Sequence, residues 1–208
     1  MIDSEAAARA FVAGLADAAG MARLERLAAL VLAENRRQNL IARASEERIW
    51  QRHIADSAQL ITHVSRETLA AEAGGPWLDL GSGPGFPGLV IAALCPQMPV
   101  VLVEARALRA AFLREAVAAL DLPHCQVEGR RLERVPPFAA RAISARAFAP
   151  LARLLALSAP FSTDQTAYLL PKGRSAAQEL AGLDPAIRAM FHVKHSLTDP
   201  EAGIIVRV

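Results

Sequence analysis

A glycine-rich loop between an apolar strand and an apolar helix is the feature that most constrains this chain of 208 residues. Residues 77–88 read WLDLGSGPGFPG, and LVIAALC follows. A strand, a glycine turn and a helix in this order bind nucleotides in doubly wound folds. Gly83, Gly85 and Gly88 match the G-x-G-x-x-G spacing of dinucleotide sites. Gly81, Gly83 and Gly85 match the G-x-G-x-G spacing of S-adenosylmethionine (SAM) sites. The glycines alone leave a dehydrogenase and a methyltransferase open.

The residues around these glycines favour SAM. Asp79 lies two positions before Gly81. Its carboxylate can accept hydrogen bonds from loop amides, or it can reach the ammonium of a methionine moiety through water. The same carboxylate would repel a pyrophosphate. Pro84 and Pro87 lack the N–H donors that a pyrophosphate needs. Glu104, about 20 residues past the glycines, ends the next apolar run, where a carboxylate accepts hydrogen bonds from ribose hydroxyls. NAD and SAM share that ribose, so Glu104 predicts a nucleoside without choosing between them.

Alternating apolar runs and helix-like stretches after residue 77 predict an α/β fold. The expected strands are 77–80, 100–104, 124–128, 141–145 and 166–171. The expected helices are 86–95, 106–120, 148–158 and 174–182, which predicts a parallel sheet covered on both faces. Runs at 191–197 and 203–208 predict a C-terminal antiparallel hairpin. This is the chain order of the class I SAM-dependent methyltransferase fold, a Rossmann-like, mostly parallel seven-stranded sheet.

The first part of the chain is predicted to be helical. Apolar periodicity predicts one helix over 4–19 that stops at Gly20, and a second over 22–38. A third helix is predicted to begin at Ser45, with four residues on one face: Ile49, His53, Asp56 and Leu60. We therefore expect a helical extension over residues 1–65, packed on a methyltransferase domain over residues 66–208.

The composition and the start of the sequence indicate a soluble, cytoplasmic protein, and we expect it to be a monomer. The hydrophobic fraction is 53%, and no apolar run approaches the ~20 residues that span a bilayer. Asp3 and Glu5 stand where a secretion signal would carry basic residues. Cys95 and Cys125 have no metal-like spacing, so we expect free thiols and no metal site.

The segment after the fourth predicted strand restricts the methyl acceptor. It reads ISARAFAPL, without the Asn/Asp-Pro-Pro-aromatic loop typical of exocyclic amine methylation. Neither Cys95 nor Cys125 is placed to act as the nucleophile that pyrimidine carbon-5 methylation needs. Acceptors that already carry a lone pair remain. Guanine N7 is one of them, and oxygen or small-molecule acceptors stay open.

Basic residues follow the predicted strands at the edge where a ligand would bind. Of 23 basic residues, only Lys172 and Lys194 are lysine. Six residues lie at or just past strand ends: Arg106, Arg109, Arg130, Arg131, Arg146 and Lys172. A basic rim on a nucleotide site suits a phosphate-rich substrate, so we expect contact with RNA.

The chain resembles the ribosomal RNA small subunit methyltransferase G family, which methylates guanine N7 in the decoding-region loop of bacterial 16S rRNA. The resemblance rests on RQNLIA, RHIADS, LDLGSGPGFPG, VEARALRAAFLRE, ISARAFAPL and PKGR, in the family's order and spacing from about residue 35 onward. It implies SAM as methyl donor and 16S rRNA or the small ribosomal subunit as partner. The chain departs from the family at Leu108, where lysine is common.

The resemblance also implies two sets of site residues. The SAM-binding set is Gly81, Ser82, Gly83, Phe86, Glu104, Ala105, Arg131, Leu132 and Arg146. The catalytic and RNA-facing set is Asn39, Arg52, His53, Arg130, Arg146 and Lys172. A lone histidine on a helix is more often a packed core residue, so only the resemblance assigns a role to His53.

Two other functions compete with methyl transfer. The G-x-G-x-x-G spacing fits an NAD-dependent oxidoreductase. The arginine-rich rim also fits a non-catalytic RNA-binding factor of ribosome assembly.

Overall fold

A seven-stranded sheet forms the centre of the computed structural model, which describes residues 1–70 and 74–207. Its spatial order is β3-β2-β1-β4-β5-β7-β6. The strands are β1 (Trp77–Leu80), β2 (Val100–Val103), β3 (Cys125–Glu128), β4 (Ala142–Ala145), β5 (Ala167–Gly173), β6 (His192–His195) and β7 (Gly203–Arg207). The first five pair in parallel, and β7 is antiparallel to both β5 and β6. The predicted methyltransferase sheet and hairpin are confirmed. Val208, at the end of the predicted last strand, lies outside the described residues.

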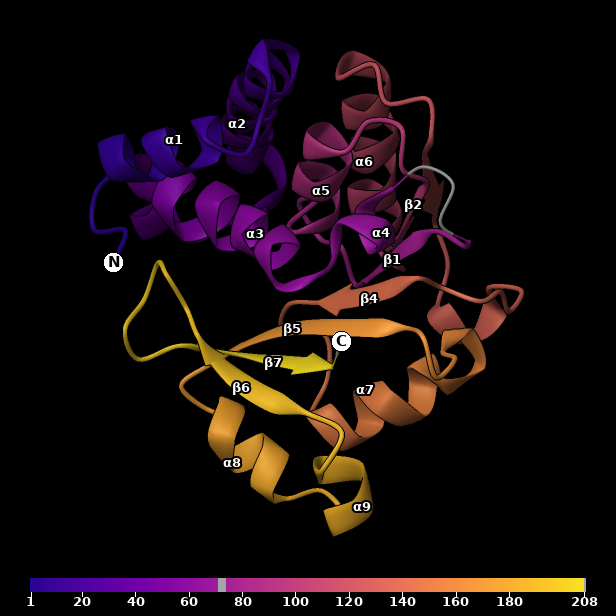
Figure 1. The fold of residues 1–208 in the computed structure, drawn as a ribbon. Coiled ribbons are helices and arrows are strands. Elements are labelled where there is room, and N and C mark those ends of the chain that lie inside the picture. The colour runs from indigo at the N-terminus through magenta and orange to yellow at the C-terminus, as the bar shows by residue number, and fades with distance from the viewer. Residues whose placement is uncertain (71–73, 208) are drawn as a thin grey trace.

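Alternate residues of the strands pack in two separate hydrophobic cores, one on each face of the sheet. Trp77, Val100 and Leu102 pack with the N-terminal helices, α5 (Gly88–Leu94) and α6 (Ala107–Ala119). Leu78, Val101 and other strand residues pack with α7 (Leu151–Ser158), α8 (Ala176–Ala181) and the chain around Phe191. Figure 1 shows these two sets of helices on opposite sides of the sheet. The sheet is therefore covered on both faces, as parallel strands require.

Four longer helices follow the predicted pattern. They are α5 (Gly88–Leu94), α6 (Ala107–Ala119), α7 (Leu151–Ser158) and α8 (Ala176–Ala181), each starting one to three residues later than predicted. Shorter elements complete this part: η4 (Leu132–Arg134), η5 (Ala159–Phe161) and α9 (Pro185–Arg188). Among the helices of residues 1–70 and 74–207, none has the length and apolar character needed to cross a membrane.

The first predicted helix boundary is wrong. The helix α1 (Glu5–Ala13) ends before Gly14, and α2 (Ala18–Gln38) begins after Asp17. The Asp17 carboxylate accepts a hydrogen bond from the Gly20 N–H at 2.6 Å, so Gly20 lies in the first turn of α2 and stops nothing. An aspartate N-cap outweighs the tendency of glycine to end a helix, because it satisfies an otherwise unpaired amide.

The predicted third helix is wrong in type. The chain passes through η1 (Arg43–Arg48), a π-helix η2 (Trp50–Ala55), one turn of α-helix, α3 (Asp56–Ala58), and the 3-10 helix η3 (Gln59–His63). The short α4 (Arg66–Leu69) follows. The Glu5 carboxylate accepts hydrogen bonds from the Trp50 and Gln51 amides at 3.1 and 2.8 Å. A carboxylate from α1 thus holds the start of η2, and π-helical turns are frequent at functional sites.

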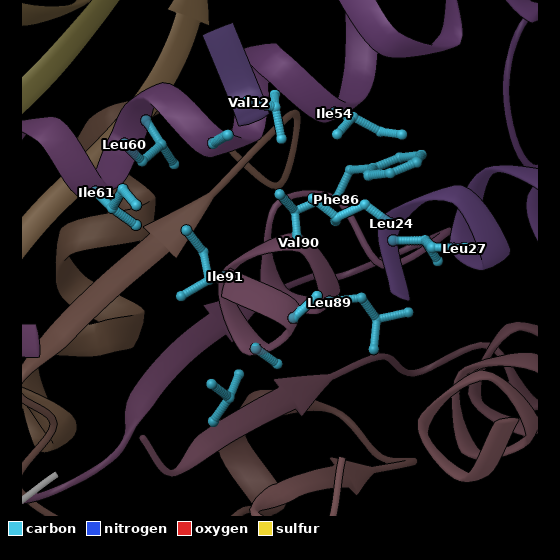
Figure 2. Packing of buried hydrophobic residues seen from close by; sticks show 14 of the residues in the cluster. Val12, Leu24, Leu27, Ile54, Leu60, Ile61, Phe86, Leu89, Val90 and Ile91 are labelled. Carbon is cyan, nitrogen blue, oxygen red and sulfur yellow. The ribbon is translucent and has the colours of Figure 1, made fainter. Parts of the chain in front are cut away.

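The N-terminal helices share one core with the sheet. Val12 of α1, Leu24 of α2 and Ile54 of η2 pack in one cluster with Phe86 and α5 (Figure 2). These apolar side chains are buried, and each contributes about 1.5–3 kcal/mol on burial. The N-terminal helices therefore help to fix the glycine loop from behind.

Candidate functional site

The glycine loop between β1 and α5 satisfies its own amides. The Ser82 N–H donates to the Val103 carbonyl at 3.0 Å, and the Gly85 N–H donates to the Ser82 carbonyl at 2.8 Å. The Gly83 N–H donates to the Glu104 carboxylate at 3.0 Å. The Gly88 N–H donates to the Asp79 carboxylate at 3.2 Å. A pyrophosphate site needs such amides pointing at its ligand, so this loop is built for a different nucleotide.

Asp79 is a buried anchor below this loop. Its second carboxylate oxygen accepts a hydrogen bond from Ser144 Oγ at 2.7 Å, and the Trp77 indole N–H donates to that same Oγ at 2.9 Å. Burial raises the pKa of Asp79, while the Ser144, Ser82 and Gly88 donors act in the opposite direction. The prediction that Asp79 bonds to a loop amide is confirmed.

A cleft of about 520 Å³ opens above the loop, at the carboxyl ends of β1, β2 and β4. We call it the glycine-loop cleft; Gly81, Glu104, Ala105, Leu132 and Phe148 are among its lining residues. Glu104 is buried, and its other oxygen accepts the Arg106 N–H at 2.8 Å. Five arginines also line the cleft: Arg106, Arg109, Arg130, Arg131 and Arg153. Four of them belong to the predicted basic rim.

The residues that line the glycine-loop cleft suit SAM. The fixed Glu104 carboxylate offers acceptor lone pairs for ribose hydroxyls, and Leu132 with Phe148 gives apolar surface for an adenine. Gly81 has φ +65°, and a Cβ built there lies 2.7 Å from Phe148 Cδ2. Glycine at this position therefore lets the ring and the backbone meet at the cleft wall.

Phe86 and Ser82, two of the predicted SAM-binding residues, do not line the glycine-loop cleft. Phe86 is 2% exposed, and its ring stacks on the His53 ring with centroids 5.1 Å apart. Figure 2 shows Phe86 beside Leu24 and Ile54. Ser82 is buried and donates its hydroxyl to the Asp79 carbonyl at 3.1 Å. Both residues support the loop from beneath.

A chain of hydrogen bonds links Arg146, at the end of β4, to the segment before η2. The Arg146 guanidinium lies 3.0 Å from His53 Nδ1, and His53 Nε2 lies 2.8 Å from Ser45 Oγ. The Ser45 hydroxyl in turn donates to the Ala42 carbonyl at 2.8 Å. Because an arginine only donates, we assign Nδ1 as acceptor and place the ring proton on Nε2. Burial, followed by the charges of Arg146 and Arg52, lowers the pKa of His53 to about 3. His53 is therefore neutral at physiological pH.

A second cavity of about 330 Å³ lies beside Arg146. We call it the Arg146 cavity; its walls include Arg52, His53, Asp56, Arg146, Pro171 and Thr198. Arg146 NH1 lies 3.6 Å from Asp56 Oδ2, and Arg52 lies 2.9 Å from Asp199. The cavity thus joins the N-terminal segment, the ends of β4 and β5, and the β6–β7 loop.

The remaining predicted site residues hold separate positions. Lys172 is 7% exposed at its side chain, donates to the Ala149 carbonyl at 2.6 Å and pairs with Glu179 at 2.9 Å. Arg130 pairs with Glu128 at 2.8 Å, at the cleft rim. Asn39 is exposed and ends α2 in a left-handed conformation. Lys172 therefore anchors the loop after β4, and a contact between Lys172 and RNA stays a prediction.

Sequence reasoning missed Asp56, Phe148 and Arg153 as site residues. The signal for Asp56 was available, because helical spacing places it on the same face as His53. Phe148 lies in the turn after β4 and Arg153 lies in the first turn of α7, and neither position gave a local signal.

Comparisons with known proteins agree with this geometry. The family model described as GidB, rRNA small subunit methyltransferase G, matches residues 21–201. A protein named Ribosomal RNA small subunit methyltransferase G from Erythrobacter litoralis is 57% identical over 206 residues, covering 99% of this chain and 97% of the relative. The protein of the same name from Novosphingobium aromaticivorans is 56% identical over 190 residues, covering 91% and 81%. Among solved structures, the METTL16 MTase domain matches in fold, with a TM-score of 0.58, 13% identity, and 74% and 68% coverage.

Proposed function

The chain belongs to the rRNA small subunit methyltransferase G family, and from this we propose that it methylates N7 of a guanine in the decoding-region loop of bacterial 16S rRNA. The observation that carries the proposal is the position of Arg146. Arg146 follows Ala145, whose register partner Leu80 directly precedes Gly81. Arg146 lines the Arg146 cavity and the next residue, Ala147, lines the glycine-loop cleft, so the methyl donor and the acceptor base can meet beside Arg146.

The glycine-loop cleft is the proposed SAM site. Gly81 and Gly83 shape the loop, Glu104 accepts ribose hydroxyls, and Ala105, Arg131 and Leu132 border the adenine. When bound, SAM supplies a methyl group whose sulfonium becomes a neutral thioether as guanine N7 forms the new N–C bond. No proton leaves in this reaction, because guanine N7 carries none.

The residues around Arg146 suit a reaction without a general base. His53 is neutral, accepts a hydrogen bond from Arg146 and stacks on Phe86, so it orients the guanidinium. Arg146 stays charged and offers its remaining N–H donors to the acceptor base. Holding both reactants in line is then the main catalytic contribution. Arg52, Arg130 and the cleft arginines are proposed to contact RNA phosphates.

Neither competing function fits as well. An NAD-dependent oxidoreductase would need loop amides for a pyrophosphate, and four of those amides are already paired. A non-catalytic assembly factor would not need a neutral histidine to hold Arg146. We further propose that residues 1–65 form a helical extension on a catalytic domain of residues 66–208, and that the protein acts as a monomer in the cytoplasm.

The direct test uses small ribosomal subunits that lack the modification. Incubation with methyl-labelled SAM should place label in 7-methylguanosine at one position of 16S rRNA. Arg146→Ala should slow this transfer by roughly a hundredfold, because it removes a donor from the reacting centre. Arg134→Ala is the matched control, since Arg134 is exposed on η4. Label that appears elsewhere, or not at all, would contradict the proposal.

A further inference from the structure

Asp56 holds one carboxylate oxygen rigidly and presents the other beside Arg146. Its Oδ1 accepts hydrogen bonds from Thr198 Oγ1 at 2.7 Å and from Gln59 Nε2 at 2.9 Å. Its Oδ2 lies 3.6 Å from Arg146 NH1, an ion pair longer than a hydrogen bond. The Asp56 side chain is 19% exposed and lines the Arg146 cavity. Oδ2 is therefore an oriented acceptor with room for a donor.

The other cavity carboxylate is already occupied. Asp199 Oδ2 accepts from Arg52 at 2.9 Å, and Asp199 Oδ1 accepts from the Glu201 N–H at 3.1 Å. Arg52 holds the pKa of Asp199 below its usual value. Among the residues that the structure describes, Asp56 is thus the cavity carboxylate with an oxygen to offer.

Arg146 supplies the donor next to this acceptor. Its guanidinium uses one N–H on His53 and one on the Arg52 carbonyl, at 3.0 and 3.3 Å, and its side chain is 23% exposed. A guanidinium has five N–H donors, so three remain. Asp56 and Arg146 together present an acceptor beside a donor to one cavity.

This pair complements one purine and not the other. Guanine carries an N1–H donor beside an O6 acceptor, with the N7 acceptor next along the same rim. Adenine reverses the first two positions, with an N1 acceptor beside a 6-amino donor. Asp56 matched to N1–H and Arg146 matched to O6 would leave guanine N7 beyond Arg146, on the side away from Asp56.

We propose that the Arg146 cavity receives the target base, and that Asp56 and Arg146 read its N1–H and O6 to select guanine over adenine. This inference rests on the proposed function and adds the residue that sets base specificity. The reaction also favours this arrangement. Methylation at N7 leaves the purine with a positive charge, which strengthens a hydrogen bond from N1–H to a carboxylate.

The test compares two 16S rRNA transcripts that carry guanine or adenine at the target position. The wild-type chain is first assayed on the bare transcripts and on small subunits reconstituted from them. The form that the wild-type chain methylates is then used throughout. For each transcript, the single-turnover transfer rate and the dissociation constant are measured. The variant is Asp56→Asn, whose amide keeps an acceptor for Thr198 and can donate to adenine N1. Glu201→Gln is the matched control, a carboxylate three residues from Thr198 in the β6–β7 loop that pairs with exposed Arg174.

Asp56→Asn should reduce the guanine-over-adenine ratio by about tenfold or more, taken as the ratio of transfer rates or of association constants. Glu201→Gln should leave the ratio unchanged. SAM affinity and thermal unfolding should match the wild type in both variants. If Asp56→Asn does not fold, Asp56→Ser serves, and it should also reduce the ratio, because its single short hydroxyl leaves guanine N1–H without a carboxylate acceptor.

An unchanged ratio in Asp56→Asn would overturn the inference, even if transfer to both transcripts slowed equally. That result would mean that Asp56 only positions Arg146. A wild-type chain that transfers no methyl group to guanine N7 would instead refute the proposed function. The two failures are therefore distinguishable.

Discussion

His53 Nδ1 accepts a hydrogen bond from the Arg146 guanidinium across 3.0 Å, although the two residues are 93 positions apart in the chain. The contact requires a neutral imidazole with its proton on Nε2, where Ser45 Oγ accepts it. A histidine held in this way positions an arginine and does not transfer protons. Three of the following predictions concern His53 or the start of η2, the helix that carries it.

Replacing His53 with phenylalanine should slow methyl transfer while leaving SAM binding intact. Phenylalanine keeps an aromatic ring on Phe86 but leaves the Arg146 donor without its acceptor. An unpaired donor of this kind costs about 1–3 kcal/mol, or roughly ten- to hundredfold in rate. Single-turnover kinetics and calorimetric SAM titration separate the two effects. His195→Phe, on exposed β6, is the control, and equal rates for the two variants would refute the role of His53.

The pH dependence of stability should carry the signature of His53. Its folded pKa of about 3 lies below the ordinary value of 6.5, so the unfolded chain binds a proton first as the pH falls. The contribution of His53 is therefore complete above pH 6.5 and declines as the pH falls towards 3. Urea unfolding across this range should show a shallower decline for His53→Phe than for the wild type. Parallel curves would mean that His53 titrates normally in the folded protein.

Alanine at Gly81 should weaken SAM binding more than alanine at Gly83. Both glycines have positive φ, +65° and +55°, so both substitutions carry similar backbone strain of about 1–2 kcal/mol. A Cβ at position 81 would meet Phe148 at 2.7 Å, but at position 83 the nearest atom is Arg109 NH1 at 3.7 Å. We expect Gly81→Ala to raise the SAM dissociation constant about tenfold by displacing Phe148. Equal dissociation constants would show that the ring does not form the cleft wall.

Glutamine at Glu5 should destabilise the fold by about 1–2 kcal/mol, as loss of a helix cap does. The Glu5 carboxylate holds the Trp50 and Gln51 amides, and an amide side chain can satisfy only one of them. Because Arg52 and His53 follow directly, methyl transfer should slow as well. Urea midpoints measure the first effect and single-turnover rates the second. Glu47→Gln, an exposed carboxylate of η1, should change neither.

The parts of the fold that could be predicted from the sequence are those with local causes. Strands such as Val100–Val103 are short apolar runs, and the glycines that follow residues 77–80 identify the loop after β1. The anchor role of Asp79 followed from its place just before the loop. These features need only neighbouring residues and the geometry of parallel strands.

The parts that could not be predicted depend on distant side chains. Residues 43–63 depart from an α-helix where Glu5, 45 positions away, bonds to the Trp50 amide. Phe86 could be assigned to the cofactor site by resemblance, but its stacking on His53 requires the N-terminal segment to be in place. The sequence likewise suggests that Lys172 is an exposed cation, but it donates a hydrogen bond to the Ala149 carbonyl, 23 positions away. Each case is a long-range pairing that no local pattern records.

The hydrogen bond between Asp56 and Thr198 closes a loop of 142 positions, which bears on how the protein acquires its function. The glycine-loop cleft draws its lining from residues 81–157, so its contacts are comparatively local. The Arg146 cavity needs the start, middle and end of the chain at once, and such distant contacts form slowly. A refolding chain should therefore gain a place for the methyl donor before it gains a place for the methyl acceptor.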